Sequence, residues 1–474
     1  MANLPDFITS NTPVSKDDRI SWAKGIAPAY AGIMLWYAFW QALVNLGDFS
    51  NTSAAILSQG VGVALAALAA AAAICFIFFY YVPGMLGMTT GRPLSVIGTS
   101  VFCARGGFIL PGFLMGLLQF GWLSVNATFA SILLWQCFKG DFATESTVIV
   151  HDQLFWIIAV VFIILAVFMA YKGMKLVGFI GQYAVLVPIA AMVLLLIPTF
   201  KGVGAFKPDM IVSADPSAVP MTTMAIFLGV TAYITGFFAT AGAAGADISS
   251  NARGKSDVIW GGFFGIFVAT FIAGAAAILT VAGAYGAGIP GITGNNPVAM
   301  INALWGTKVA LVFNILLVIS AFPAACVSSL IGIASLKSTL SKIPPFVSVG
   351  LCTLAAIGIC LMGWGLDAGS IFGFIGASFG PVCGAMMAEY ILTGGKWTGP
   401  RAGFSPAGWL AWLLGFIVGN WNVAFESIHW AGFKGLTGFE MPCTPMSAFI
   451  VGFVVYFLFC WARTSVIELE SEKE

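Results

Sequence analysis

Long apolar stretches recur along almost the whole chain, and short polar connections separate them. A bilayer core about 30 Å thick needs roughly 20 apolar residues per helix, so each stretch is long enough to cross a membrane. The pattern predicts an all-α membrane protein with about twelve transmembrane helices. These are expected at residues 23–46, 54–82, 108–138, 151–171, 176–200, 222–246, 258–285, 306–336, 346–364, 368–393, 405–425 and 444–463.

The composition points to the same class. Hydrophobic residues make up 59% of the chain and charged residues 8%, and the mean hydropathy is +0.98. An ordinary soluble domain carries roughly 25% charged residues, so a soluble fold is excluded. Most of the surface is therefore expected to contact membrane lipid, and only the polar segments 1–22 and 464–474 are expected to form tails in water.

The positive charges are divided unevenly between the two sides that alternating spans define. All but five of the 20 Lys and Arg residues fall on one side. By the positive-inside rule that side is cytoplasmic, and adding or removing one span would destroy the asymmetry. The sequence therefore predicts a multi-pass protein of the plasma (inner) membrane with both termini in the cytoplasm.

Other function classes lack support in the sequence. The net charge of +1 and the absence of a dense basic run argue against a nucleic-acid partner. The nine cysteines show no CxxC spacing and are expected to be packing residues. The chain has neither an HExxH motif nor a Gly-x-Ser-x-Gly elbow, which argues against an enzyme, and no cofactor is expected. It also lacks the repeated filter sequence of a channel.

Two spans are interrupted by small residues beside aromatic ones. The first contains Gly25 to Gln41 and the sixth contains Thr235 to Asp247. Broken helices at membrane depth are tolerated beside a cavity, although Gly and Ala also permit close helix packing. The two segments lie five spans apart, as expected for inverted repeats at 23–200 and 222–393 followed by two additional helices at 405–463. Such matched interruptions are the best sequence indication of a transporter's binding site.

Several segments, in order, resemble one family of transporters. They are Arg19-Ile-Ser-Trp22, Thr90-Gly-Arg-Pro93, Gly121-Trp122 with Asn126 four residues later, Gly245-Ala-Asp247, and Gly380-Pro381 with Glu389-Tyr390. From Arg19 to about Thr393 the chain is similar to the nucleobase and cation symporters typified by bacterial cytosine permease and the hydantoin transporter.

The resemblance implies a fold of two inverted five-helix repeats and a function by alternating access. Spans one, two, six and seven would move against spans three, four, eight and nine. The implied activity is secondary active symport that imports a planar heterocycle of the cytosine, purine, uracil or hydantoin class, with Na+ as the coupling ion. The alternative is a proton-coupled symporter of another heterocycle, such as allantoin or the vitamin precursors hydroxymethylpyrimidine and pyridoxine.

Aromatic residues are expected to stack on such a ring. The resemblance aligns Phe238 and Trp122 with the two aromatic residues that enclose the substrate. Asn126 lies one turn after Trp122 and is expected either to bind the amide edge of the ring or to bond to another helix. Backbone groups near the breaks in the first and sixth spans complete the expected substrate site. These breaks contain Trp36, Phe39, Thr240 and Gly242. Trp36 and Phe39 are equally expected to pack against other helices or to face lipid.

A sodium site is implied in the eighth span. Ala325-Cys-Val-Ser328-Ser329 looks like the sodium signature of this fold, and the facing carbonyls would be those of Gly32 and Leu35. The alternative is that the two serines bond back to their own helix. The family often carries Asn directly after this hydroxyl pair and again four residues later, whereas this chain has Leu330 and Ala334. The ligand is then less polar than cytosine, or is bound by Gln41, Gln119 and the backbone instead.

Two carboxylates fall near predicted cytoplasmic helix ends. Asp247 and Glu389 are expected to be gate or ion-pair residues, with Arg253, Lys255 or Lys396 as partners, rather than proton carriers.

Overall fold

A computed structural model describes the residues 5–35, 43–44, 55–142, 144–172, 186–211, 219–289, 297–340, 342–422 and 439–467. Over these ranges the chain is helical, and its only β-structure consists of two isolated bridges, Ile20 with Ala252 and Arg401 with Val466. The all-α class is therefore confirmed.

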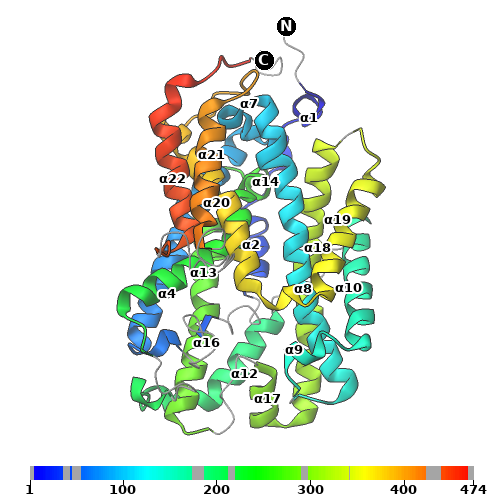
Figure 1. Ribbon diagram of the computed structural model, residues 1–474, viewed down its shortest axis with the longest axis vertical. Helices are drawn as coiled ribbons and strands as arrows, with labels where there is room; N and C mark the ends of the chain where they lie inside the picture. Colours follow the sequence, from blue (N-terminus) through cyan, green and yellow to red (C-terminus); the bar gives the residue numbers. More distant parts are fainter. Residues whose placement is uncertain are drawn as a thin grey trace, which may run out of the picture.

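The helices form one elongated bundle (Figure 1). The α-helices are α1 (Asp6–Thr9), α2 (Ile26–Met34), α4 (Val61–Ile74), α5 (Tyr81–Thr90), α6 (Leu94–Ile97), α7 (Thr99–Gly107), α8 (Met115–Lys139), α9 (Ser146–Ile149), α10 (Gln153–Lys172), α12 (Leu186–Val203), α13 (Thr223–Ala243), α14 (Gly245–Ser249), α15 (Lys255–Gly262), α16 (Ala269–Gly286), α17 (Pro297–Trp305), α18 (Thr307–Thr339), α19 (Pro345–Leu361), α20 (Ala368–Leu392), α21 (Pro406–Gly419) and α22 (Thr444–Phe459). Wider π-turns occur at Cys75–Tyr80, Phe108–Leu114 and Phe263–Val268, and short 3-10 turns at Lys16–Asp18, Ala55–Leu57, Pro208–Met210, Trp364–Leu366 and Cys460–Ala462.

These helices account for the predicted spans. Over the described residues, nine helical stretches are long and apolar enough to cross a membrane. The ninth and eleventh predicted spans correspond to the shorter apolar helices α19 and α21, and α2 lies within the first. The protein is thus an integral, multi-pass membrane protein.

Two spans five positions apart share a structural irregularity. The second span runs from α4 through the π-turn Cys75–Tyr80 into α5, and the seventh runs from α15 through the π-turn Phe263–Val268 into α16. The two π-turns contact each other. A π-turn inserts one extra residue into the helical ladder and occurs often at functional sites. An inverted repeat would produce such matching positions, and the bounds of the two repeats stay a prediction.

The third span starts earlier than predicted, because residues 99–107 already form helix α7. Inside α7 the backbone is broken at Cys103, which has φ 59° and ψ 175°, a conformation that costs energy for a residue with a side chain. Arg401 from the loop after α20 holds this break. Its backbone N–H donates to Thr99 O at 3.3 Å, and its backbone O accepts the N–H of Ala104 at 3.0 Å.

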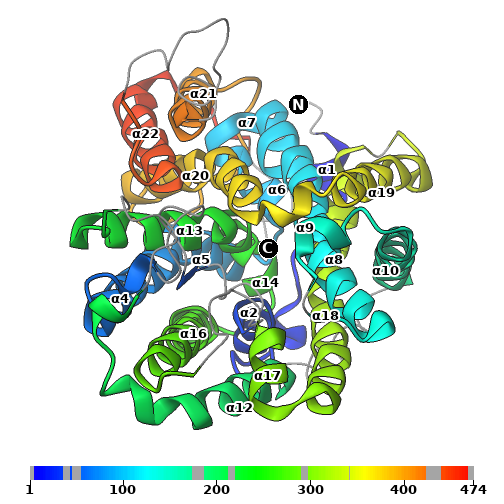
Figure 2. The ribbon, with the colours of Figure 1, turned by 60° about the horizontal axis from the view of Figure 1, so that its bottom comes forward.

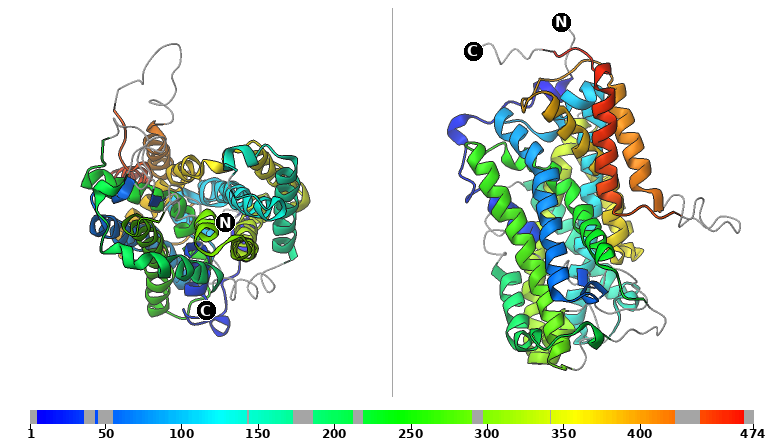
Figure 3. Two further views of the ribbon diagram at one scale, coloured as in Figure 1. Left: turned by 90° about the horizontal axis from the view of Figure 1, so that it is seen from below. Right: turned by 90° about the vertical axis from the view of Figure 1, so that its left-hand side faces the viewer.

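The last two helices pack on one edge of the bundle. Figure 2 and Figure 3 show α21 and α22 together beside α20, while α10 and α19 lie at the opposite edge. Close approach depends on small residues: a Cβ at Gly384 of α20 would collide with the backbone of Phe449 on α22. Glycine at this position therefore allows the two helices to pack backbone against backbone.

Candidate functional site

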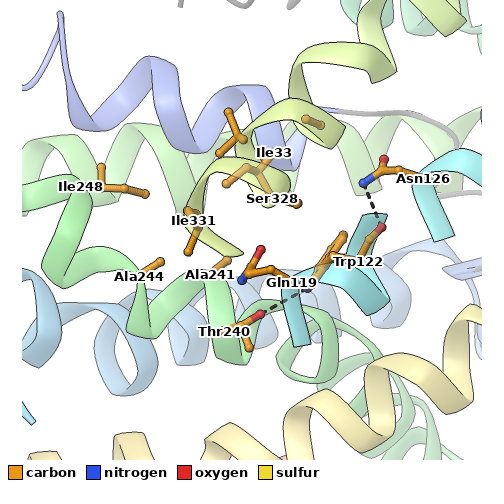
Figure 4. A pocket seen from close by; sticks show the side chains of 12 residues that line it. Ile33, Gln119, Trp122, Asn126, Thr240, Ala241, Ala244, Ile248, Ser328 and Ile331 are labelled. Atoms are coloured by element: carbon orange, nitrogen blue, oxygen red, sulfur yellow. Dashed lines mark hydrogen bonds between the residues drawn. The ribbon is translucent and has the colours of Figure 1, made fainter. Parts of the chain in front are cut away.

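A small cavity lies near the middle of the bundle, where α2, α8, α13, α14 and α18 meet (Figure 4). Its volume is about 30 Å³. This is room for on the order of two water molecules, whereas pockets that enclose a drug-sized ligand reach about 300–1,000 Å³. The described residues that line the cavity are Ile33, Gln119, Trp122, Asn126, Thr240, Ala241, Ala244, Ile248, Ala324, Val327, Ser328 and Ile331.

Helix α8 presents a polar and aromatic stripe to this cavity. Gln119, Trp122 and Asn126 are three and four residues apart, so they share one helix face. The Trp122 indole N–H donates to Thr240 Oγ1 at 3.2 Å. Its ring centroid lies 4.7 Å from that of Phe372 and 6.0 Å from that of Phe237. The indole orientation is therefore fixed by α13 and α20.

Asn126 carries an unused hydrogen-bond acceptor. The residue is 1% exposed, and its Nδ2 donates to Trp122 O at 3.2 Å within the same helix. Its Oδ1 is buried and has no hydrogen-bond partner among the described residues. An unpaired buried acceptor costs about 1–3 kcal/mol, so a ligand N–H at this point would be stabilised. The Nδ2 bond is thus to its own helix, and among the described residues Asn126 makes no hydrogen bond to another helix, which was the expected alternative.

The other expected substrate residues are not all at the cavity. Thr240 lines it, but Phe238 and Gly242 do not. Phe238 is fully buried, with its ring centroid 6.0 Å from that of Tyr30, while the neighbouring Phe237 packs on Trp122. A stacking role for Phe238 stays a prediction. Trp36 and Phe39 lie outside the described residues.

The expected sodium ligands lie on α18 and α2. Ser328 faces the cavity (Figure 4), whereas the Ser329 hydroxyl donates to Ala325 O at 2.8 Å, the bond expected if the serine served its own helix. That bond leaves lone pairs on both oxygens, and a sodium site here stays a prediction. Helix α2 ends at Met34, so Gly32 lies in its last turn and Leu35 follows directly as the C-cap residue.

Helix α18 turns a mostly apolar face to the cavity. Ala324, Val327, Ser328 and Ile331 repeat at helical spacing and line it. Leu330 and Ala334 do not line it, and Ala334 is exposed. In this structure Ser328 is therefore the one polar side chain that the described part of α18 offers to the cavity.

Asp247 lies in α14 beyond the end of the sixth span. Its carboxylate accepts the backbone N–H of Leu94 at the start of α6, and burial raises its pKa to about 6. The expected partner Arg253 donates instead to Arg19 O, at 3.2 Å. In the described part of the chain, the ion pairs found do not include Asp247.

Glu389 lies at the same end of the bundle, in a buried ion-pair cluster. Its carboxylate accepts from Arg401 at 3.1 Å, from Arg463 at 2.8 Å and from the Tyr456 hydroxyl at 3.0 Å. The Glu389 side chain is 5% exposed. Lys396 was the expected partner, but the carboxylate pairs instead with two arginines that were not predicted and that follow α20 and α22. The cluster joins α20, α22 and the loop that holds the break in α7.

Comparison with known proteins finds likeness in structure but not in sequence. No protein-family model and no curated protein matches the sequence. The inward-facing conformation of Mhp1 superimposes with a TM-score of 0.67 at 16% identity, covering 98% of this chain and 96% of Mhp1. Mhp1 with bromovinylhydantoin bound, described as a nucleobase-cation-symport-1 family transporter in a closed conformation, gives 0.62 at 15% identity, with 96% and 95% covered.

A substrate-bound, outward-open Na+-coupled sialic acid symporter also shares the fold. Its TM-score is 0.52 at 13% identity, with 98% of this chain and 93% of that chain covered. At these identities the likeness defines the fold, which is that of Mhp1. The predicted transporter fold is therefore confirmed, and its neighbours are transporters rather than enzymes.

Proposed function

We propose that this protein is a secondary active symporter that imports an uncharged, nucleobase-like planar heterocycle by alternating access. The observation that carries the proposal is the cavity on α8, where a fixed indole lies beside an amide acceptor that has no partner among the described residues. The Mhp1-like fold supports a transport function, since binding sites of such folds lie near the midplane between the repeats.

The chemistry of the cavity supports a flat and neutral ligand. Trp122 offers an aromatic surface for stacking, and Asn126 and Gln119 offer amide groups for a polar ring edge. None of the described lining residues carries a charge, so a charged ligand would lose its hydration without gaining a counter-ion. Because the cavity is too small for a ring, the helices around it have to separate before a ring can enter. Alternating access would separate them.

We propose Na+ as the coupling ion, bound by Ser328 and Ser329 hydroxyls, the Ala325 carbonyl and the last carbonyls of α2. These are neutral oxygen ligands that do not titrate near neutral pH. The test is uptake of labelled heterocycles into proteoliposomes under an inward Na+ gradient, with choline as the substitute ion. Uphill accumulation that requires Na+, and that Ser328→Ala with Ser329→Ala abolishes, is the expected result. Unchanged Na+ dependence in the double variant contradicts the sodium site.

Proton coupling is the second candidate, for a heterocycle such as allantoin, hydroxymethylpyrimidine or pyridoxine. The favouring observation is the carboxyl of Asp247, whose pKa burial raises to about 6, near physiological pH. In this case an inward proton gradient, with the outside more acidic than the inside, drives uptake without Na+. Asp247→Asn then abolishes the effect of that gradient. The same proteoliposomes distinguish the two ions.

A further inference from the structure

The polar groups around the central cavity are concentrated on one helix. Ser328 is the polar contribution of α18 and Thr240 that of α13, whereas α8 contributes two amides, Gln119 and Asn126. Leu330 and Ala334, where the sequence lacks the expected amides, do not line the cavity. Among the described residues that line the cavity, those on α8 therefore contribute most to the recognition of a polar ring.

Gln119 is buried at the cavity with a donor that is poorly used. The residue is 4% exposed, and its Nε2 has a sulfur acceptor, Met115 Sδ, at 3.5 Å. A thioether is a weak acceptor, so a ligand carbonyl that replaced it would make a stronger hydrogen bond. The amide is thus available to a ligand without breaking a strong bond.

Close packing fixes the position from which Gln119 reaches the cavity. At Gly332 of α18, a Cβ would come within 2.9 Å of the Phe120 ring and 3.4 Å of Gln119 Cβ. Helix α18 therefore approaches α8 closely at this level, and the base of the Gln119 side chain has little freedom to shift. Such support makes the amide a preorganised contact.

The spacing on α8 sets the geometry of a ligand. Gln119 and Asn126 are two helical turns apart, about 10.5 Å along the axis at 1.5 Å per residue. Trp122 lies between them, and Figure 4 shows all three side chains at the cavity. A ring placed on Trp122 therefore has an amide at each end, rather than two amides along one edge.

We propose that Gln119 is a specificity-determining residue of this site and that it works with Asn126 at opposite ends of the ligand. This inference rests on the proposed function. The expected ligand is an uncharged ring with a carbonyl at one end and a ring N–H at the other. Gln119 Nε2 donates to the carbonyl, and Asn126 Oδ1 accepts from the N–H. Each amide contacts the ligand directly.

The test uses the purified full-length protein in nanodiscs and measures ligand affinity by thermal shift or calorimetry. The probes are uracil, hypoxanthine and hydantoin, each with an N-methylated analogue and an analogue lacking one carbonyl. The variants are Gln119→Met, which keeps the side-chain volume, and Asn126→Ala. Because one unmade hydrogen bond to a buried group changes affinity by about tenfold, each loss is measurable.

For a ring that binds the wild type, Gln119→Met should weaken binding about tenfold and abolish the preference for the carbonyl over its deoxo analogue. Asn126→Ala should instead abolish the preference for N–H over N-methyl. Gln119→Met could still prefer the carbonyl ring over its deoxo analogue while Asn126→Ala behaves as expected. This result would overturn the role of Gln119 and leave the proposed function intact. If neither the wild type nor either variant binds any probe, the proposed function fails and this inference fails with it.

Discussion

The central cavity and the Glu389 cluster are both buried and polar, yet their hydrogen bonding differs. The two carboxylate oxygens of Glu389 accept three hydrogen bonds, from Arg401, Arg463 and Tyr456. At the cavity, Asn126 Oδ1 has no partner within the part of the chain that the structure describes, and Gln119 Nε2 has a weak one. A satisfied polar network rigidifies a fold, whereas an unsatisfied group costs free energy until something binds it.

The difference separates a structural role from a binding role. The Glu389 cluster connects the loop of Arg401, the end of α20 and the segment after α22, and Arg401 Nε also donates to Ser100 O at 2.9 Å across the break in α7. The cavity lies between helices that would have to move apart under the proposed function. Substitutions in the cluster should therefore change stability, and substitutions at the cavity should change binding.

The largest effect is expected for Glu389→Gln. The amide cannot neutralise two guanidinium groups, and breaking a buried ion pair by removing one partner costs about 3–5 kcal/mol. We expect the lower part of that range because the Arg463 side chain is 24% exposed. Thermal unfolding of the purified protein measures the loss, and the exposed Asp209→Asn serves as the control. Unfolding of Glu389→Gln within about 0.5 kcal/mol of the wild type would contradict a structural role, since ordinary surface changes fall in that range.

A smaller effect on binding is expected for Trp122→Phe. The variant keeps an aromatic face but loses the N–H that donates to Thr240 Oγ1. Ring affinity should fall by about three- to tenfold, since one hydrogen bond contributes about 0.5–1.5 kcal/mol. Thr240→Val removes the same bond from the other side and should lower affinity similarly in the same calorimetric titration. A loss in Trp122→Phe that Thr240→Val does not reproduce would mean that indole shape, rather than this bond, matters.

A third effect, on stability rather than on binding, is a pH dependence at Asp247. Because burial raises its folded pKa to about 6 from 3.8, the folded state binds the proton at higher pH than the unfolded state. Stability should therefore rise as pH falls from about 7 to about 4. Asp247→Asn should flatten this part of the profile of Tm against pH. An unchanged slope in the variant would show that other carboxyl groups produce it.

Much of the fold was predictable because it depends on local pattern. Apolar stretches define spans, and the spacing of Trp122 and Asn126 places them on one helix face whatever the partners are. The start of the third span was not predicted. Residues 99–107 fold as a broken helix around Arg401, about 300 residues away, and no local pattern reports such a contact.

The site was less predictable because it depends on helix rotation. Phe237 and Phe238 differ by about 100° around α13, so the sequence shows two adjacent rings without showing which one faces Trp122. Tertiary packing directs Phe237 to Trp122 and Phe238 toward Tyr30. Glu389 was similarly paired in prediction with the nearby Lys396, although its partners come from later in the chain.

The proposed contact joins an uncharged ring in the cavity to Asn126 Oδ1, which has no partner among the described residues. A matched pair of asparagine variants tests this contact. Asn314 is equally buried, and its Oδ1 likewise has no hydrogen-bond partner among the described residues, but it lies away from the cavity lining. Its Nδ2 donates to Leu133 O at 3.2 Å and Gln136 Oε1 at 3.3 Å. The measurement is a thermal-shift panel of nucleobases, hydantoins, allantoin and pyrimidine or pyridine vitamins, in sodium or choline, on the wild type, Asn126→Ala and Asn314→Ala.

A ligand present at 100 times its Kd should stabilise the folded protein by about 2.7 kcal/mol. We expect a ring to stabilise both the wild type and Asn314→Ala, although Asn314→Ala starts from a lower Tm. The same ring should stabilise Asn126→Ala much less. Equal stabilisation of Asn126→Ala and the wild type, or no stabilisation of the wild type by any ring, would contradict the proposed contact.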